Sequence, residues 1–439
     1  MAEKKNFTIE NYNGTDYDTL YPETNSGQVL LDRDAQVTTG LASGSTLDDA
    51  LQSVVKDAGA FQVGDTLTTA RTNLGDKWLL CNGTQITQTD YPALVGLLGA
   101  KPFNWISKGT STTANINYIV NKTTATGDLF LAKSDTPVDR YYSCYYSTDL
   151  LSWQSLQTST GKFLIWCANG TWIISYSNDT GSSKISRYYS GENMNFSNFV
   201  SINGINGLIY GVAYWNGKYC INAPDTLLDR NNSSIFVYTD LSQAPTIIHL
   251  NTNNVVNASN YGQMSVVPDG LVVCAGIYSN SDLTYRIDVV DAQNSVSHYN
   301  GTITDYAAYP TSIQYFNGYY YMTTYYQAPP ILRHTLFRST TLNGSYSKVK
   351  YNDTEEVTAT NITITDDYLI TDTGYYIDKE NNVYKQANPI TATVPILVGK
   401  DKYYTMVNTT AYQSNIAASA NLPSVSTASG LYTYIKAKS

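Results

Sequence analysis

The residues that could hold a metal ion are few and scattered in this sequence. The cysteines are Cys81, Cys144, Cys167, Cys220 and Cys274, and the histidines are His249, His298 and His334. They form no CxxC pair and no spaced Cys/His set, which excludes the usual zinc sites. Three cysteines stand inside strand-like runs (LIWCA, KYCIN and LVVCA), where we expect small buried hydrophobes. Asp366-Asp367 lacks the alternating oxygen ligands of a calcium loop and predicts a solvated turn. No cofactor is implied.

The residues that could hydrolyse a glycan are arginines and carboxylates. A sialidase-like site needs clustered arginines and acidic partners near one axis, and we expect Arg140, Arg230 and Arg333 to reach one face. Two-carboxylate hydrolysis needs a pair about 5–9.5 Å apart, which sequence spacing does not establish. The adjacent Glu355 and Glu356 are better explained as loop residues. The sequence contains no GxSxG, P-loop or HExxH motif.

The residues that could bind a sugar lie in segments rich in Asn, Asp and Tyr between predicted strands. A tyrosine ring can cover the C–H face of a sugar, while amides and carboxylates pair with its hydroxyls. The segments are residues 178–179, 224–232, 251–261, 278–282 and 325–333. The candidate ligand-binding residues are Tyr278, Tyr325, Tyr326, Asp225, Arg230 and Asp179. The alternative is that each tyrosine only packs its own loop.

The composition predicts a mainly β protein with little net field at its surface. Charged residues are 14% of the 439 positions, against roughly 25% in an average soluble protein. The chain has 39 Tyr and 10 Phe, and aromatic residues favour strands. A net charge of −9 argues against nucleic acid and against electrostatic docking on anionic membranes. The N-terminus lacks the apolar region of a signal peptide, and no run is long enough to span a membrane, so we expect no membrane insertion.

The elements that must position these residues repeat along residues 105–409. An apolar, Tyr-rich hairpin alternates with a more polar one, and successive units begin roughly 45–50 residues apart. The apolar hairpins are residues 163–177, 211–223, 264–276, 312–325 and 361–373; the polar ones are 140–157, 186–202, 233–250, 283–299, 334–351 and 381–397. Four strands at this period predict a β-propeller blade. Six polar hairpins predict about six blades, and residues 398–408 either close the ring or begin a seventh.

A family resemblance is carried by the run KWLLCNG (77–83), followed by YPAL (91–94) and LLG (97–99). It resembles the tail-collar module of phage tail fibres, in which a W-L-x-C-[DN]-G strand and turn precede a short helix. We expect Leu94, Leu97 and Leu98 to form the apolar stripe of that helix. Residues 410–439 resemble the closing strands of such fibres, and the opening segment resembles the N-terminus of fibres from phages of Gram-positive hosts. Ser147-Thr148-Asp149…Trp153 resembles one Asp-box turn of sialidase-type propellers, without its Gly.

These patterns predict an arm and a head. We expect an N-terminal attachment arm over residues 1–45, a short oligomerisation helix over 46–60, and a first collar-like segment over 61–104. The propeller over 105–409 is then inserted before closing collar-like strands over 410–439. The helix carries the apolar stripe Leu47, Leu51, Val54, Val55 and Ala58, which must be buried either against its own chain or, as we expect, in a homotrimeric bundle.

The resemblance implies a receptor-binding protein of a virion tail or phage-tail-like bacteriocin, made in the bacterial cytoplasm and released by lysis. Its expected partners are a cell-surface glycan or S-layer protein and other tail or baseplate proteins. We expect no enzyme activity. Two alternatives stay open: a glycan-degrading tail enzyme of sialidase or depolymerase type, and a purely structural baseplate component.

Overall fold

The chain divides into two compact units in the computed structural model. One unit holds residues 1–100 and 418–439, and the other holds residues 101–417. The structure describes residues 9–12, 17–20 and 63–437, the last range with gaps at 76, 99–101, 114–115, 135–141, 160–162, 178–183, 206, 225–232, 251–263, 277–283, 303–307, 329–330, 387–388, 417–418 and 429. The predicted helix over 46–60 lies outside these residues. No helix in the described ranges is long and apolar enough to cross a membrane.

The first unit is built from both ends of the chain. Its three-stranded sheet has the order β3–β38–β4, β37 pairs with β5, and β1 pairs with β2. The bounds are β1 Ile9–Tyr12, β2 Tyr17–Leu20, β3 Thr66–Thr69, β4 Trp78–Leu80, β5 Gln85–Thr87, α3 Pro92–Leu97, β37 Ser419–Asn421 and β38 Tyr432–Lys436. Trp78 pairs with Lys436, and Leu79 pairs with Ile435. The two collar-like segments are therefore hydrogen-bonded neighbours.

The helix of this unit only partly follows the predicted stripe. Leu94 is buried, but Leu97 is 65% exposed and Val95 is buried in its place. Residues advance by about 100° each around an α-helix, so Leu97 lies more than a quarter-turn from the direction midway between positions 94 and 95. The predicted turn at Asn82-Gly83 does form, with Gly83 at φ +80.

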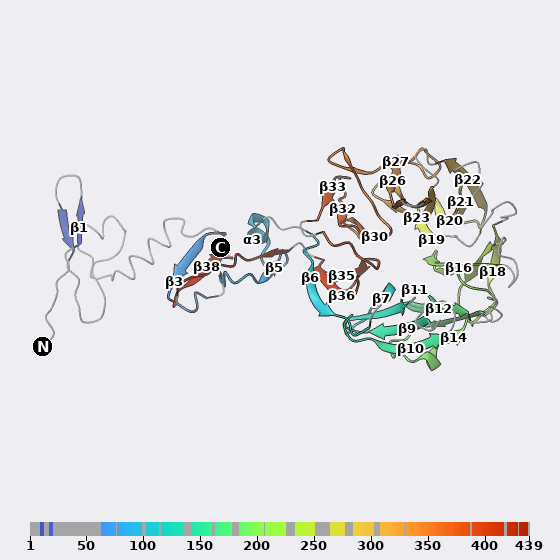
Figure 1. The fold of residues 1–439 in the computed structure, drawn as a ribbon, viewed down its shortest axis with the longest axis horizontal. Coiled ribbons are helices and arrows are strands. Elements are labelled where there is room, and N and C mark those ends of the chain that lie inside the picture. The colour runs from blue at the N-terminus through green and yellow to red at the C-terminus, as the bar shows by residue number, and fades with distance from the viewer. Residues whose placement is uncertain are drawn as a thin grey trace. The chain divides into compact units, whose positions relative to one another are not determined.

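The described part of residues 101–417 forms seven antiparallel sheets arranged around a ring, which is a β-propeller (Figure 1). Blade 1 is β7 Ile116–Thr123, β8 Asp128–Ser134, β9 Tyr142–Ser147 and β10 Gln154–Ser159; blade 2 is β11 Phe163–Ala168, β12 Thr171–Ser177, β13 Lys184–Tyr189 and β14 Val200–Ser201; blade 3 is β15 Gly211–Trp215, β16 Lys218–Pro224, β17 Ser233–Tyr238 and β18 Thr246–His249; blade 4 is β19 Met264–Val267, β20 Gly270–Gly276, β21 Thr284–Val290 and β22 Val296–Thr302.

The remaining blades are less regular. Blade 5 is β23 Ala308–Phe316, β24 Tyr319–Ala328, β26 Leu336–Ser339 and β27 Ser347–Lys348, with β25 Ile331–Arg333 also paired to β24; blade 6 is β30 Ile362–Ile364, β31 Leu369–Thr371, β32 Tyr375–Ile377 and β33 Val383–Lys385; blade 7 is β34 Leu397–Val398, β35 Lys402–Val407, β36 Thr410–Asn415 and β6 Ile106–Thr110. The short pair β28 Lys350–Tyr351 and β29 Glu355–Glu356 and the 3-10 turn η1 Phe196–Asn198 lie outside these sheets.

The ring has seven blades because its last sheet is completed by an earlier segment. Strand β6 pairs antiparallel with β36, with Ser107 opposite Tyr412. Six complete polar hairpins can be counted along the sequence, whereas the outer half of blade 7 joins two distant segments. The predicted boundaries shift accordingly: residues 410–415 belong to the propeller and not to the collar-like strands, and so does Phe103.

Each neighbouring pair of blades shares one hydrophobic cluster. Between blades 3 and 4 the cluster includes Ile235 and Leu250 on one side and Val273 and Val290 on the other. Seven such clusters account for all seven junctions of the ring. Every blade therefore buries both faces, which explains why its inner hairpin is an apolar run and not a strict alternation.

The turns of the blades follow local backbone chemistry. Three of the predicted apolar hairpins turn at an Asn-Gly pair, at 169–170, 216–217 and 317–318, and both residues of each pair have positive φ, as a type I′ turn requires. In blade 1 the Asp-box-like corner forms: Asp149 Oδ1 accepts from the Leu151 and Ser152 amides, both at 2.8 Å. Leu150 adopts φ 65 where such a turn would favour Gly.

Candidate functional site

None of the six candidate sugar-binding side chains is among those that the structure describes. Tyr278, Asp225, Arg230 and Asp179 fall in the gaps of the described ranges. Tyr325 and Tyr326 lie in β24, where only their backbone is described, opposite Tyr309 and Ala308. Strand β24 continues to Ala328, and residues 326–328 pair with residues 331–333 of β25, where we expected an open loop. The assignment of these residues to binding stays a prediction.

The carboxylates weighed for hydrolysis, Glu355 and Glu356, form the short strand β29 and not the loop that we expected, and each pairs with a different lysine. Glu355 Oε1 accepts from the Tyr375 hydroxyl at 2.5 Å and pairs with Lys385 Nζ at 2.9 Å. Its neighbour Glu356 pairs instead with Lys348, at 2.8 Å. Hydrogen bonds from Tyr375 and Lys385 lower the pKa of Glu355, which is opposite to what a general acid needs.

The described first strands of the blades carry no Asp, Glu, Arg or His. The first strands of blades 7, 1, 2, 3, 4 and 5 contact one another in succession, which places them nearest the axis of the ring. An axial pair of carboxylates, as a two-carboxylate glycosidase requires, is therefore missing from the described strands. The described residues also contain no cluster of His, Cys, Asp and Glu that could hold a metal ion. Asp367 pairs with Lys379 at 2.8 Å, which fits a solvated turn.

The cysteines whose side chains are described, Cys81, Cys144, Cys167 and Cys220, are free. Cys220 is buried as predicted, whereas Cys167 is only half-buried; Cys144, for which no prediction was made, is also buried. Burial raises the pKa of the Cys167 and Cys220 thiols to about 11. A thiol with such a pKa is a poor nucleophile at neutral pH, so these residues are structural.

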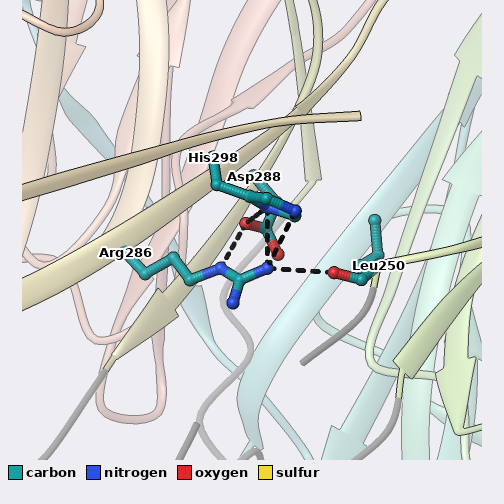
Figure 2. A network of polar contacts seen from close by, with 4 residues as sticks. All are labelled: Leu250, Arg286, Asp288 and His298. Carbon is teal, nitrogen blue, oxygen red and sulfur yellow. Dashed lines mark hydrogen bonds and ion pairs between the residues drawn. The ribbon is translucent and has the colours of Figure 1, made fainter. Parts of the chain in front are cut away.

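One charged cluster interrupts the apolar packing between blades. It consists of Arg286 and Asp288 on β21, His298 on β22, and the backbone carbonyl of Leu250, which follows β18 of blade 3 (Figure 2). Residues two apart on a strand share a face, so Arg286 and Asp288 share the face on which Val290 packs against blade 3. His298 is the cross-strand partner of Asp288. We name these three side chains the junction cluster.

The carboxylate of Asp288 is the centre of the junction cluster. Its side chain is 0% exposed, while those of Arg286 and His298 are 12% and 38% exposed. Arg286 Nε donates to Asp288 Oδ1 at 2.6 Å, and Arg286 Nη2 donates to the Leu250 carbonyl at 2.9 Å. Asp288 Oδ2 is buried and has no hydrogen-bond partner among the described residues. A buried charge of this kind must be paired, and Arg286 supplies the pairing charge.

The contacts of His298 fix its tautomer. Its Nδ1 lies 2.8 Å from Asp288 Oδ1 and 2.7 Å from Arg286 Nη2, and it can hydrogen-bond to only one of them through a single proton. We assign that proton to Nδ1, donating to Asp288, because a bare Nδ1 lone pair would face the buried carboxylate and repel it. In the neutral ring Nε2 is then an acceptor on the exposed side of the cluster.

The chemistry of this arrangement is binding and not proton transfer. Because the Asp288 carboxylate is enclosed, it cannot reach a glycosidic oxygen. The polar atoms least engaged within the cluster are Arg286 Nη1 and His298 Nε2, a donor and an acceptor whose side chains are both hydrogen-bonded to the same carboxylate. The sequence signal for this cluster is the pattern Arg-x-Asp on an otherwise apolar strand, and none of its three side chains is among the six predicted binding residues.

No family model matches the sequence, and no curated protein is similar to it. Solved structures with limited likeness include a mutant of the Aleuria aurantia lectin in complex with α-methyl-L-fucoside, at 10% identity over 73% of this chain and 99% of that one, with a TM-score of 0.37. A putative gluconolactonase has 8% identity, covers 74% and 97%, and has a TM-score of 0.38. The GH43 endo-arabinanase from Bacillus licheniformis has 15% identity, covers 56% and 94%, and has a TM-score of 0.30. At these values the likeness says nothing about what this chain binds.

Proposed function

We propose that this chain is a receptor-binding protein of a phage tail or phage-tail-like particle, and that its propeller attaches to a glycan on the bacterial surface. In this proposal the unit made from the two chain ends joins the protein to the tail. The propeller is the head that meets the host.

The observation that carries this proposal is the way in which the propeller is inserted. Strands β4 and β38, from the two collar-like segments, pair within one unit that has its own core of Cys81, Ile86 and Leu94. The propeller is closed separately by β6 on β36. A self-contained head between two halves of an attachment module fits a protein that anchors through one unit and recognises through the other.

The amino-acid composition supports a neutral ligand. The sequence combines a net charge of −9 with an excess of Tyr over Phe. Tyr provides large contact area with a hydroxyl at low rotamer cost, as in other binding surfaces. A negative protein has no electrostatic reason to bind a phosphate-rich polymer, whereas an uncharged glycan suits hydroxyl and aromatic contacts.

Several heads on one particle would strengthen a weak interaction. We propose a homotrimer, joined through the stripe predicted over residues 46–60, as the unit that assembles on the tail. Linked binding sites can raise the overall affinity by about 10²–10⁴ when geometry lets them engage together.

The test compares the full chain with a variant in which a Gly/Ser linker replaces residues 101–417. Both proteins are labelled and mixed with intact cells from a panel of Gram-positive strains, and cooperative unfolding of the variant checks that the first unit folds. We expect the full chain to bind a subset of strains and the variant to bind none. Equal binding by both proteins would place recognition in the first unit. Binding by neither, together with incorporation into particles, would favour the structural-component alternative.

A further inference from the structure

Building on the proposed function, we infer that the junction cluster of Arg286, Asp288 and His298 is a sugar-binding subsite that holds two neighbouring hydroxyls of a neutral glycan. One hydroxyl accepts a hydrogen bond from the Arg286 guanidinium, and the other donates to His298 Nε2. Asp288 does not touch the sugar; it is a positioning residue.

The first step is the free hydrogen-bonding capacity of the cluster. Arg286 Nε and Nη2 are used by Asp288 and Leu250, and no described residue hydrogen-bonds to its Nη1. Figure 2 shows this nitrogen without any dashed contact. His298 Nε2 lies 3.4 Å from Arg286 Nη2, at the limit of a hydrogen bond. The cluster therefore offers one unused donor nitrogen, Nη1, and one weakly engaged acceptor, Nε2, which match the two roles of a pair of hydroxyls.

The second step is rigidity. A guanidinium fixed by two hydrogen bonds and an imidazole fixed by a buried carboxylate lose little conformational freedom when a ligand binds, and such preorganisation favours affinity. The exposed fraction falls from His298 to Arg286 to Asp288, 38%, 12% and 0%. The cluster is thus open on the His298 side and closed behind Asp288, as expected for a subsite at the outer strands of the blade.

The third step is charge. The negative charge of Asp288 offsets that of Arg286, so this ion pair carries no net charge. A phosphate or carboxylate ligand would bind little more strongly than a hydroxyl at such a site. It would also be repelled by the buried Asp288 carboxylate, whose Oδ1 lies 2.6 Å from Arg286 Nε, behind the guanidinium. The geometry therefore favours a neutral sugar over an anionic polymer.

An arginine on the third strand of another blade serves as a comparison for Arg286, because its contacts are those of a structural residue. Arg187 on β13 donates from Nη1 to the Phe199 carbonyl at 3.3 Å, and its guanidinium covers the Phe196 ring at 5.0 Å. Its Nε is buried without a hydrogen bond to any described residue. Arg187 is packed against its own blade, so it is the matched control for Arg286.

The experiment uses four variants of the full chain that separate touching from positioning. An Asn side chain can place an amide donor near the position of imidazole Nδ1, so His298→Asn keeps a hydrogen bond to Asp288 and loses the Nε2 acceptor. His298→Gln places its amide near the Nε2 position and loses the bond to Asp288. Arg286→Met removes the guanidinium, and Arg187→Met is its control.

The probes are the methyl glycosides of glucose, galactose, mannose, rhamnose and N-acetylglucosamine, each followed by saturation-transfer NMR with the full-length protein. Inorganic phosphate serves as the anionic competitor. We expect at least one glycoside to give a signal that His298→Asn weakens about 3- to 10-fold and Arg286→Met about 10-fold or more. His298→Gln should retain more of the signal than His298→Asn, and Arg187→Met should retain all of it.

The outcomes separate this inference from the proposed function. If the chain binds cells and all four variants bind the glycoside like the unmodified protein, the subsite is elsewhere and the inference is wrong while the function stands. If no glycoside gives a signal, or if phosphate displaces it, the inference is also wrong. If a glycoside binds and His298→Asn weakens it while no strain is recognised, the subsite stands and the proposed host attachment falls.

Discussion

A single hydrogen bond next to the closing strand gives a quantitative test of the ring. Trp105 precedes β6, is 7% exposed, and donates from Nε1 to the buried Gln386 Oε1 at 2.8 Å. The other amide atom, Gln386 Nε2, has no partner among the described residues. Trp105→Phe leaves the whole amide unpaired, which costs about 1–3 kcal/mol, and the smaller ring adds about 1 kcal/mol of lost packing. We therefore expect a loss of about 2–4 kcal/mol in the free energy of unfolding of the propeller.

The control is a second buried tryptophan that makes no such bond. Trp172 is 0% exposed and its Nε1 has no partner among the described residues, so Trp172→Phe removes an unsatisfied donor together with some packing. Its net cost should be about 1 kcal/mol or less, because the two effects oppose each other. The double variant Trp105→Phe/Gln386→Leu replaces both partners by apolar groups, and it should regain about 1–2 kcal/mol relative to additivity.

The assay is urea unfolding of the full chain, followed by far-UV circular dichroism. Two units give two transitions, so the propeller transition is fitted separately. If Trp105→Phe and Trp172→Phe cost the same, or if the double variant is simply additive, then the Trp105–Gln386 bond does not hold the closing segment. Strand pairing of β6 with β36 would then have to close the ring without it.

Three further predictions concern the corner turn and the surface. Leu150→Ala should cost about 2–5 kcal/mol of unfolding free energy, measured in the same urea assay, because Leu150 is fully buried between blades. Burial raises the pKa of Asp149, but hydrogen bonds from the Ser152 and Leu151 amides and the Ser147 hydroxyl lower it more, so its pKa is below the ordinary value. The stability that Asp149 supplies is therefore present above about pH 4 and lost as pH falls below it. Asp149→Asn should flatten that acid loss in thermal melts between pH 5 and about pH 2.5, and an unchanged pH profile would contradict it. The affinity for cells should change less than about 3-fold between 50 and 500 mM NaCl, because a neutral glycan forms no ion pairs with the protein. A steep fall in affinity with salt would indicate an anionic receptor.

The repeating part of the fold could be predicted because its causes are local. Asn-Gly turns need positive φ wherever they occur, and apolar hairpins at a constant spacing need a common partner on each side. The blade count stayed open between six and seven because its cause is not local. Strand β6 is separated from β36 in the sequence by almost the whole propeller, and the sequence of Ile106–Thr110 does not indicate which strand it pairs with. The prediction that Leu97 is buried was wrong for a similar reason. The helix α3 is short, and its packing against residues of the neighbouring strands determines which of its side chains are buried.

The junction cluster shows which part of a site a strand pattern can and cannot give. Period-2 alternation places Arg286 and Asp288 on the same face as Val290, and β21 is the only described third strand that carries both an Arg and an Asp. Two opposite charges on a face that must be buried are expected to pair with each other, because an unpaired charge there would cost several kcal/mol. That much was open to sequence reasoning. The partner His298 depends on the register of β21 with β22, and the Leu250 carbonyl comes from the neighbouring blade. Since both are tertiary facts, the sequence could indicate the strand and its ion pair but not the His298 and Leu250 contacts that complete the junction cluster.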